Sequence, residues 1–496
     1  MTSSLKVGHL TEPALEFGGG GKHIDMRYGL ASYGPVDFSD GSTRTVRLGL
    51  IGSVHSAGKF REWLRRCEDF IPGKQSNQPT LFPDFPGASI TGPFRCYFEV
   101  EDRDVQTIST TSISRITAQP DDDVAVQMAV DEFCQQIQAI AESEKPPNVI
   151  ICALPLEIIE RVSNMRVSGG TDDAEKDDEE EEQRGSERGG ADFRGALKAK
   201  SLGFRIPIQI VWPSTYDNDA VVKRKLAAHS TRRVQDEATR AWNFFCALYY
   251  KSGGTPWRMI RDNKAFDATF LGISFYESLD GTALMTSSAQ LFDERGEGLI
   301  LKGALALKDK LDRQPYMSEE DAFKLAQRAL QTYKQEHRNY PARLVIHKSS
   351  RFHPQEMKGL QTAVEAAEID IADFLWFPRR SPVRLLRNGI YPPLRGTTLR
   401  LDDSQSILYT NGSVDFFRTY PGMYIPNPLT IRAIRQDTMN WDVLLAETLA
   451  LTKMNWNRTQ FDGALPITLK AAHQVGEILK YVPDNVVPDP RYRFYM

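Results

Sequence analysis

A stretch from Ala268 to Tyr276 limits most strongly what this chain can fold into. It is apolar and rich in β-forming residues, and it follows the polar run from Arg261 to Lys264. This pattern predicts the first strand of a buried sheet. A second run of the same kind, Ala342 to Ser350, follows a long helical pattern and leads into a further helix. Buried strands that alternate with helices predict an α/β fold.

Both strands carry a small polar residue where they end, Ser274 in the first and Ser349 in the second. Ribonuclease H-like enzymes use such strand ends to hold carboxylates, which bind two divalent cations and activate water. A serine hydroxyl supplies no negative charge and is a poor ligand for magnesium. The sequence therefore predicts the scaffold of such an enzyme without its catalytic metal.

Composition places the chain among soluble globular proteins of several domains, since 41% of its 496 residues are hydrophobic and 25% are charged. No apolar run approaches the roughly 20 residues that span a bilayer. The first residues lack the apolar stretch of a signal peptide. The five cysteines form no CxxC pair, so neither a zinc site nor a disulfide framework is indicated. We expect a cytoplasmic protein without a membrane partner.

The net charge of −4 does not exclude a nucleic-acid partner. Residues 171–190 hold ten acidic and three basic residues, a local charge of −7, so the remaining chain carries +3. A segment with so many like charges and no apolar face cannot bury enough surface to fold. We expect a disordered acidic insertion at about 170–190, and a remainder that can gather basic residues on one surface.

The order of patterns predicts two domains after an N-terminal arm at 1–40. In 41–255, strands such as 148–154 and 206–212 alternate with helices such as 125–142, which predicts a parallel, doubly wound, Rossmann-like domain. Residues 256–496 form the second domain. The four glycines before Lys22 lack the rest of a phosphate-binding loop, because His23 stands where Ser or Thr is required.

Four residues of the first domain are candidates for a phosphate clamp. Arg194 and Lys198 lie four apart on one helical face, Gln209 lies in a strand, and Lys251 ends a helix. Arginine binds phosphate by a fork and lysine as a point charge. From spacing alone, solvated surface charge is the better interpretation.

A second candidate surface combines aromatic and basic residues. The strand that ends at Phe377 runs into Arg379 and Arg380, and Asn455 and Asn457 flank Trp456. Aromatic rings can stack on bases, and arginines neutralise phosphates. A buried strand followed by a charged loop, with local capping by the two asparagines, explains the pattern equally well.

Taken together, these features resemble the MID and PIWI halves of a short prokaryotic Argonaute. The resemblance rests on an Arg-x-x-x-Lys helix, an Ile-Pro-x-Gln strand, a Lys-x-Gly-Gly helix end, a ribonuclease H-like region and an aromatic C-terminus. It implies a Rossmann-like MID domain followed by a ribonuclease H-like PIWI domain.

The resemblance also implies roles for residues. Arg194, Lys198, Gln209 and Lys251 would hold the 5′-phosphate of a guide. The carboxylate at Met496 would share a structural Mg²⁺ with that phosphate, and Ala247 stands where many relatives have a further lysine. The slicing residues of the family map to Ser274, Ser349 and His473, so the PIWI domain is expected to be catalytically inactive and to hold no catalytic metal.

The function that the resemblance implies is guided recognition. The chain would bind a 5′-phosphorylated guide RNA, pair it with complementary single-stranded DNA and leave the effector step to a second subunit. In the family that subunit carries an APAZ region with a sirtuin-like or TIR NAD-consuming domain, or with a nuclease, and acts in antiviral defence by abortive infection. We favour an NADase partner.

Two alternatives remain open. In one, the chain is a metal-dependent nuclease that recruits Asp267 and Glu277, which flank the first strand. In the other, it is a structural adaptor that binds no guide.

Overall fold

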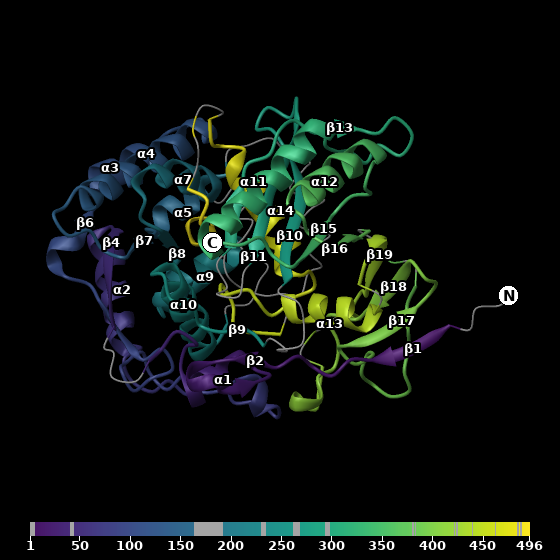
Figure 1. The fold of residues 1–496 in the computed structure, drawn as a ribbon. Helices are drawn as coiled ribbons and strands as arrows, with labels where there is room; N and C mark the ends of the chain where they lie inside the picture. Colours follow the sequence, from purple (N-terminus) through teal and green to yellow (C-terminus); the bar gives the residue numbers. More distant parts are fainter. Residues whose placement is uncertain are drawn as a thin grey trace.

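Figure 1 shows a computed structural model in which a smaller and a larger sheet, each with helices on its faces, lie side by side. The structure describes residues 5–39, 44–162, 192–229, 235–260, 268–292, 298–378, 381, 383–420, 422, 425–438, 440–461, 463–483, 486 and 489–496. The acidic insertion at about 170–190 lies outside these ranges.

The first domain is a parallel sheet with helices on both faces. Its strands are β4 (Arg44–Gly52), β5 (Cys96–Glu99), β6 (Val105–Thr107), β7 (Val149–Ala153) and β8 (Ile208–Val211), in the order β5-β4-β7-β8 with β6 also beside β4. Helices α2 (Val54–Arg66) and α10 (Glu237–Lys251) cover one face. Helices α3 (Thr110–Thr117), α4 (Asp122–Ala141), α5 (Leu156–Val162) and α7 (Phe193–Ser201) cover the other. The predicted doubly wound domain is confirmed.

The second domain is built on a mixed sheet. Its central strands β10 (Ala268–Glu277), β15 (Arg343–Lys348) and β16 (Ile371–Trp376) are parallel. Strands β11 (Leu284–Phe292) and β12 (Gly298–Leu301) extend it on one side by antiparallel pairing. On the other side follow β19 (Leu429–Gln436), β18 (Gln405–Leu408), β17 (Thr397–Arg400) and β1 (Lys6–His9), also antiparallel.

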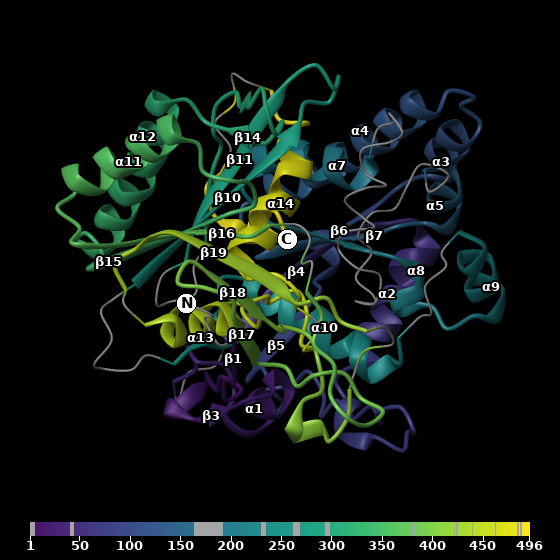
Figure 2. The ribbon, with the colours of Figure 1, turned by 90° about the vertical axis from the view of Figure 1, so that its right-hand side faces the viewer.

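Helices cover both faces of this sheet (Figure 2). Helices α11 (Glu319–His337) and α12 (Pro354–Ala366) pack on one face, and α13 (Trp441–Leu451) and α14 (Ile467–Leu479) pack on the other. Helix α14 approaches β10 closely, since a Cβ at Gly272 would lie 2.2 Å from the main-chain oxygen of Thr468. Glycine at this position therefore lets helix and strand touch.

One hydrophobic core joins the two domains. It includes Trp242 of α10 and Leu469 of α14, together with the last aromatic residues of the chain. The rings of Tyr250 and Trp456 stack across the boundary, with centroids 4.4 Å apart. Tyr492, Phe494 and Tyr495 are buried, so the prediction that the aromatic C-terminus is tucked in is confirmed.

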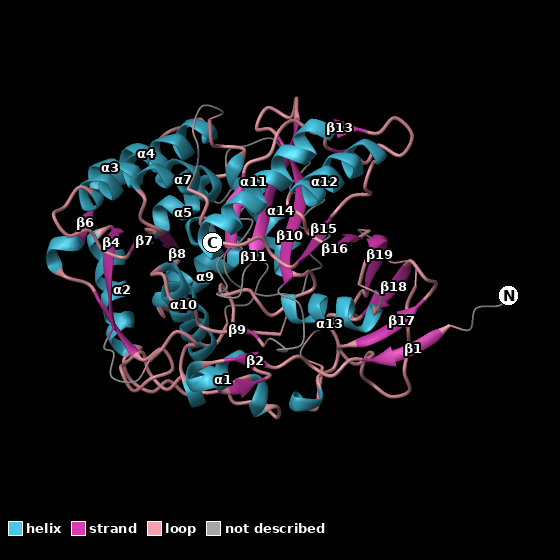
Figure 3. Ribbon diagram, in the orientation of Figure 1, coloured by secondary structure: helices cyan, strands magenta, loops and turns pink. Residues whose placement is uncertain are grey.

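Two elements of the N-terminal segment pair with later parts of the chain (Figure 3). β1 forms an edge of the nine-stranded sheet, and β2 (Leu15–Glu16) pairs with β3 (Lys22–His23) and β9 (Arg258–Met259). The residues expected as an arm thus contribute strands that pair with residues 258–259 and 397–400, both in the second domain. Sequence patterns gave no sign of this pairing or of β19.

Candidate nucleic-acid interface

Three elements of the first domain bring the candidate phosphate residues together. Helix α7 begins after Asp192, whose carboxylate accepts hydrogen bonds from the main-chain nitrogens of Arg194 and Gly195, each at 3.0 Å. This cap fixes the start of the helix, and Lys198 follows Arg194 one turn later. Strand β8 supplies Gln209, and α10 ends at Lys251.

The two lysines are buried and point at the same small region. Lys198 and Lys251 are each 2% exposed. The Nζ of Lys251 donates to the main-chain oxygen of Ile208 at 3.0 Å and to Oε1 of Gln209 at 2.5 Å. The Nζ of Lys198 donates to the main-chain oxygen of Met496. The predicted residues of α7, β8 and α10 therefore meet, and the last residue of the chain meets them.

Several cationic side chains lie close together at this site, and the pKa values of the two lysines are lowered. Burial, then Lys251 and then Arg194 hold the pKa of the Lys198 ammonium well below its ordinary value. Burial, followed by Arg194, lowers the pKa of Lys251 to about 7. Lys251 donates to two neutral amide oxygens, whereas Lys198 donates to a main-chain oxygen of Met496, the residue predicted to supply a carboxylate.

Such a cluster is costly in the absence of an anion. Burying a charge without an opposite charge is strongly unfavourable, and like charges nearby add to the cost. An anion placed among Arg194, Lys198 and Lys251 removes both penalties. A terminal phosphate, with up to two negative charges and several acceptor oxygens, matches the donors offered here.

The oxygens that would ligate a magnesium ion at this site are the main-chain oxygen of Met496 and Oε1 of Gln209. Each of them already accepts a hydrogen bond from a lysine ammonium. Magnesium prefers six oxygen ligands and usually at least one carboxylate. Over the described part of the chain, no group of three or more His, Cys, Asp or Glu residues could hold a metal ion. The lysines can therefore bind a phosphate directly, and the predicted carboxylate of Met496 is the ligand through which a magnesium ion would bind there.

The two serines that the resemblance maps to the slicing positions are neighbours. Ile273 of β10 lies opposite Lys348 of β15, and the next residues, Ser274 and Ser349, place their hydroxyls 3.4 Å apart. His473 is half-buried on α14, the helix that packs against β10. Ser349 directly follows β15, but Ser274 lies inside β10, which continues to Glu277, so the prediction that Ser274 ends its strand is wrong. The fold still brings together two hydroxyls where a metal site would need carboxylates.

The remaining predicted residues are placed less informatively. Asn455 and Asn457 are half-buried, and Oδ1 of Asn455 accepts a hydrogen bond from the main-chain nitrogen of Asn457 at 3.1 Å, which is local capping. Glu277 is exposed at the end of β10. Arg379, Arg380 and Asp267 lie outside the described residues.

Comparison with solved structures identifies this architecture. The chain is similar to the Argonaute of Clostridium butyricum, solved bound to a guide DNA and a 19-mer target DNA, with a TM-score of 0.63 and 17% identity. The fold is an Argonaute fold. It is also similar to Drosophila Piwi, with a TM-score of 0.54 and 13% identity, and to A. aeolicus Argonaute, with a TM-score of 0.52 and 15% identity.

These alignments take in nearly the whole chain but only part of each Argonaute. They cover 98%, 98% and 97% of this chain, and 54%, 56% and 54% of the three Argonautes. The Argonaute fold includes MID and ribonuclease H-like PIWI domains, so the predicted fold class is confirmed. No protein-family model and no curated protein matches the sequence. No helix in the described residues is long and apolar enough to cross a membrane.

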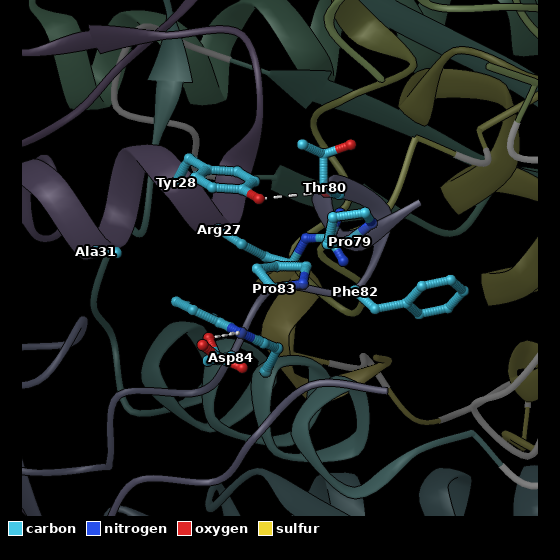
Figure 4. Close-up of a pocket in the computed structure, with 9 residues that line it drawn as sticks. Arg27, Tyr28, Ala31, Pro79, Thr80, Phe82, Pro83 and Asp84 are labelled. Carbon is cyan, nitrogen blue, oxygen red and sulfur yellow. Dashed lines mark hydrogen bonds between the residues drawn. The ribbon is translucent and has the colours of Figure 1, made fainter. Parts of the chain in front are cut away.

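A separate pocket of about 380 Å³ opens between α1 (Met26–Tyr33), the segment 79–84 and α10 (Figure 4). Its wall includes Tyr28, Phe82 and Trp242. Arg27, which also lines it, is paired with Asp25 at 3.1 Å. None of the residues predicted from the sequence lies in this pocket.

Two contributions to the phosphate cluster were not visible in the sequence. The main-chain oxygen of Ile208 holds Lys251, and Tyr492 lies close enough to Arg194 for each to shift the pKa of the other. Any residue type can supply a main-chain oxygen, so the sequence does not indicate the contact made by Ile208. Tyr492 would have been found only by asking what the buried aromatic C-terminus packs against.

Proposed function

We propose that this chain binds the 5′-phosphorylated end of a guide RNA and presents the guide for pairing with complementary single-stranded DNA. One observation carries the proposal: two buried lysines converge near Arg194, and among the described residues neither lysine is paired with an Asp or Glu side chain. An anion stabilises the charged form of such a buried cluster. The structural likeness to an Argonaute solved with guide and target DNA supports the choice of a nucleic-acid end as that anion.

The proposal includes the absence of slicing. Ser274 and Ser349 supply hydroxyls where two metals would need carboxylates, and His473 alone cannot hold them. The effector step would then belong to a second, APAZ-containing subunit with NADase or nuclease activity. Target pairing would activate that subunit in prokaryotic defence, in the cytoplasm. The preference for an NADase partner and for RNA as guide rests on the resemblance to short Argonautes.

The experiment compares binding of one oligonucleotide with a 5′-phosphate and with a 5′-hydroxyl. Wild-type protein should prefer the phosphate, and the double variant Lys198→Ala/Lys251→Ala should lose about 100-fold or more of that preference, since hydrogen bonds to charged groups contribute about 1.5–3 kcal/mol each. Lys324→Ala/Lys358→Ala, which removes two exposed lysines of α11 and α12, serves as the matched control. Equal binding of both oligonucleotides by wild type would overturn the proposal.

Two further readouts complete the experiment. Without ligand, the Lys198/Lys251 variant should still unfold in a cooperative transition, which would show that a lost phosphate preference is not a lost fold. Sequencing of the nucleic acid that copurifies with wild type should give short 5′-phosphorylated RNAs. Magnesium at the guide end stays a prediction, and the phosphate preference measured with and without a chelator tests it.

A further inference from the structure

The hairpin formed by β13 (Leu307–Lys308) and β14 (Pro315–Tyr316) carries a surface that the phosphate site does not explain. Leu311 at its tip is 96% exposed, and Leu305 and Leu307 are more than one-third exposed. Three basic residues accompany them, Lys308, Lys310 and Arg313, all exposed. The hairpin thus combines apolar and cationic side chains at a protruding turn.

The tip is held rigidly by its own acidic residues. Oδ1 of Asp309 accepts a hydrogen bond from the main-chain nitrogen of Leu311 at 2.7 Å, and Oδ1 of Asp312 accepts one from that of Gln314 at 3.0 Å. Asp309 and Asp312 also face His353 and Arg351, at 3.8 and 3.6 Å. The carboxylates are therefore used to shape the turn and to hold it against the segment that follows β15.

The three cations have no such partner. Among the described residues, no carboxylate lies within salt-bridge distance of Lys308, Lys310 or Arg313. Their charges face solvent on a preformed turn, so neutralising an anion there requires little reorganisation. A row of phosphates is the anion that matches several such charges along one edge.

The hairpin also lies next to Ser349, one of the positions that the resemblance maps to slicing. The main-chain oxygen of Pro315 accepts hydrogen bonds from Oγ of Ser350 at 2.6 Å and from Nζ of Lys348 at 3.2 Å, and these residues flank Ser349. The ring of Tyr316 stacks on His353 at 4.0 Å. From Pro315 to Leu311 the chain can reach at most about 14 Å. The tip therefore stays within the width of a nucleic-acid duplex from Ser349.

We propose that the β13–β14 hairpin contacts the duplex formed by guide and target, with Lys308, Lys310 and Arg313 on the phosphates and Leu311 against the sugars of the groove. This inference rests on the proposed function, because it takes the duplex to lie across Ser274 and Ser349. Exposed leucine beside free cations suits a groove edge, where phosphates border apolar sugar faces.

The test measures how tightly a guide-loaded protein captures a complementary DNA strand at several salt concentrations. The variant Lys308→Ala/Lys310→Ala/Arg313→Ala should weaken capture, and the slope of log K against log salt should decrease in magnitude by about 2–3, since each phosphate contact contributes about 0.9. Leu311→Ala should weaken capture several-fold without changing the slope. The matched control is Lys223→Ala/Arg224→Ala/Lys225→Ala on α9 (Ala220–His229), which removes the same residue types from the first domain.

The outcomes separate this inference from the proposed function. If wild type prefers a 5′-phosphorylated guide but the hairpin variant captures the target with an unchanged slope, the hairpin inference alone is overturned. If wild type shows no preference for the phosphorylated guide, the proposed function fails, and the inference fails with it. Loss of guide binding in the hairpin variant would also overturn the inference, because the hairpin is assigned to the duplex and not to the guide end.

Discussion

Lys251 is the residue whose charge should make guide binding depend on pH. Burial, and after it Arg194, lower its pKa to about 7 in the ligand-free protein. A bound phosphate dianion favours the ammonium, so the pKa rises on binding and a proton is taken up. Above pH 7, up to the raised pKa, affinity must therefore fall as pH rises. Below about pH 6 affinity must fall as well, because the phosphate itself takes up a proton.

This pH dependence is measurable as the difference in affinity between 5′-phosphorylated and 5′-hydroxyl oligonucleotides, from pH 5.5 to 9 at constant ionic strength. The phosphate contribution should be largest near pH 6–7. Arginine stays charged at all these pH values. In the Lys251→Arg variant, the phosphate contribution to affinity should therefore fall less steeply above pH 7 than in wild type. A phosphate contribution that stays constant between pH 7 and 9 in wild type would contradict the assignment.

Strands β10 and β15 place the hydroxyls of Ser274 and Ser349 side by side, which leads to a prediction at the scale of elements. Replacing Ser274 and Ser349 by aspartate places two carboxylates at positions whose hydroxyls are 3.4 Å apart. Repulsion between the two carboxylates should lower the free energy of unfolding. Each kcal/mol lost should lower the unfolding temperature by about 2–4 °C. Mg²⁺ or Mn²⁺ should restore it, because a shared cation removes the repulsion.

Thermal unfolding with divalent cation and with chelator checks this. Ser274→Asn/Ser349→Asn, of nearly the same shape but neutral, should show no response to metal. An aspartate variant whose unfolding temperature ignores the cation would mean that the two positions do not have the required geometry.

The elements that the sequence predicted well are those whose apolar pattern is long and regular. Residues 268–276 and 342–350 became β10 and β15 because a buried strand of a parallel sheet has a run of apolar residues at its centre, such as Leu344–Ile346. β1 and β19 were not predicted, since a four-residue edge strand and a strand with an exposed arginine, Arg432, depend on pairing partners in other parts of the chain. Likewise, spacing predicted that Arg194 and Lys198 share one helical face, but only the resemblance to the family indicated that Lys251 lies with them.

At the scale of the whole molecule, the last residues tie the two domains to the phosphate cluster. The 3₁₀ turn η6 (Tyr492–Phe494) contacts β12 and α10, which belong to different domains. Leu299 of β12 forms an isolated bridge with Arg491, and Met496 accepts a hydrogen bond from Lys198. The same short segment therefore fills the core between the domains and positions one of the two lysines.

A variant that ends at Arg491 should consequently lose two properties together. Removal of Tyr492, Phe494 and Tyr495 deletes three buried rings, each worth about 3–5 kcal/mol in a core, so the domains should unfold in two separate transitions. Without Met496, Lys198 loses its acceptor, and the preference for a 5′-phosphate should fall.

Val486→Ala, at an exposed position shortly before the segment, should change neither property. Differential scanning calorimetry and the phosphate-preference assay report the two effects independently. A single cooperative transition with full phosphate preference would show that the segment contributes neither to domain coupling nor to the site. Loss of the preference within a single transition would show that it contributes to the site alone.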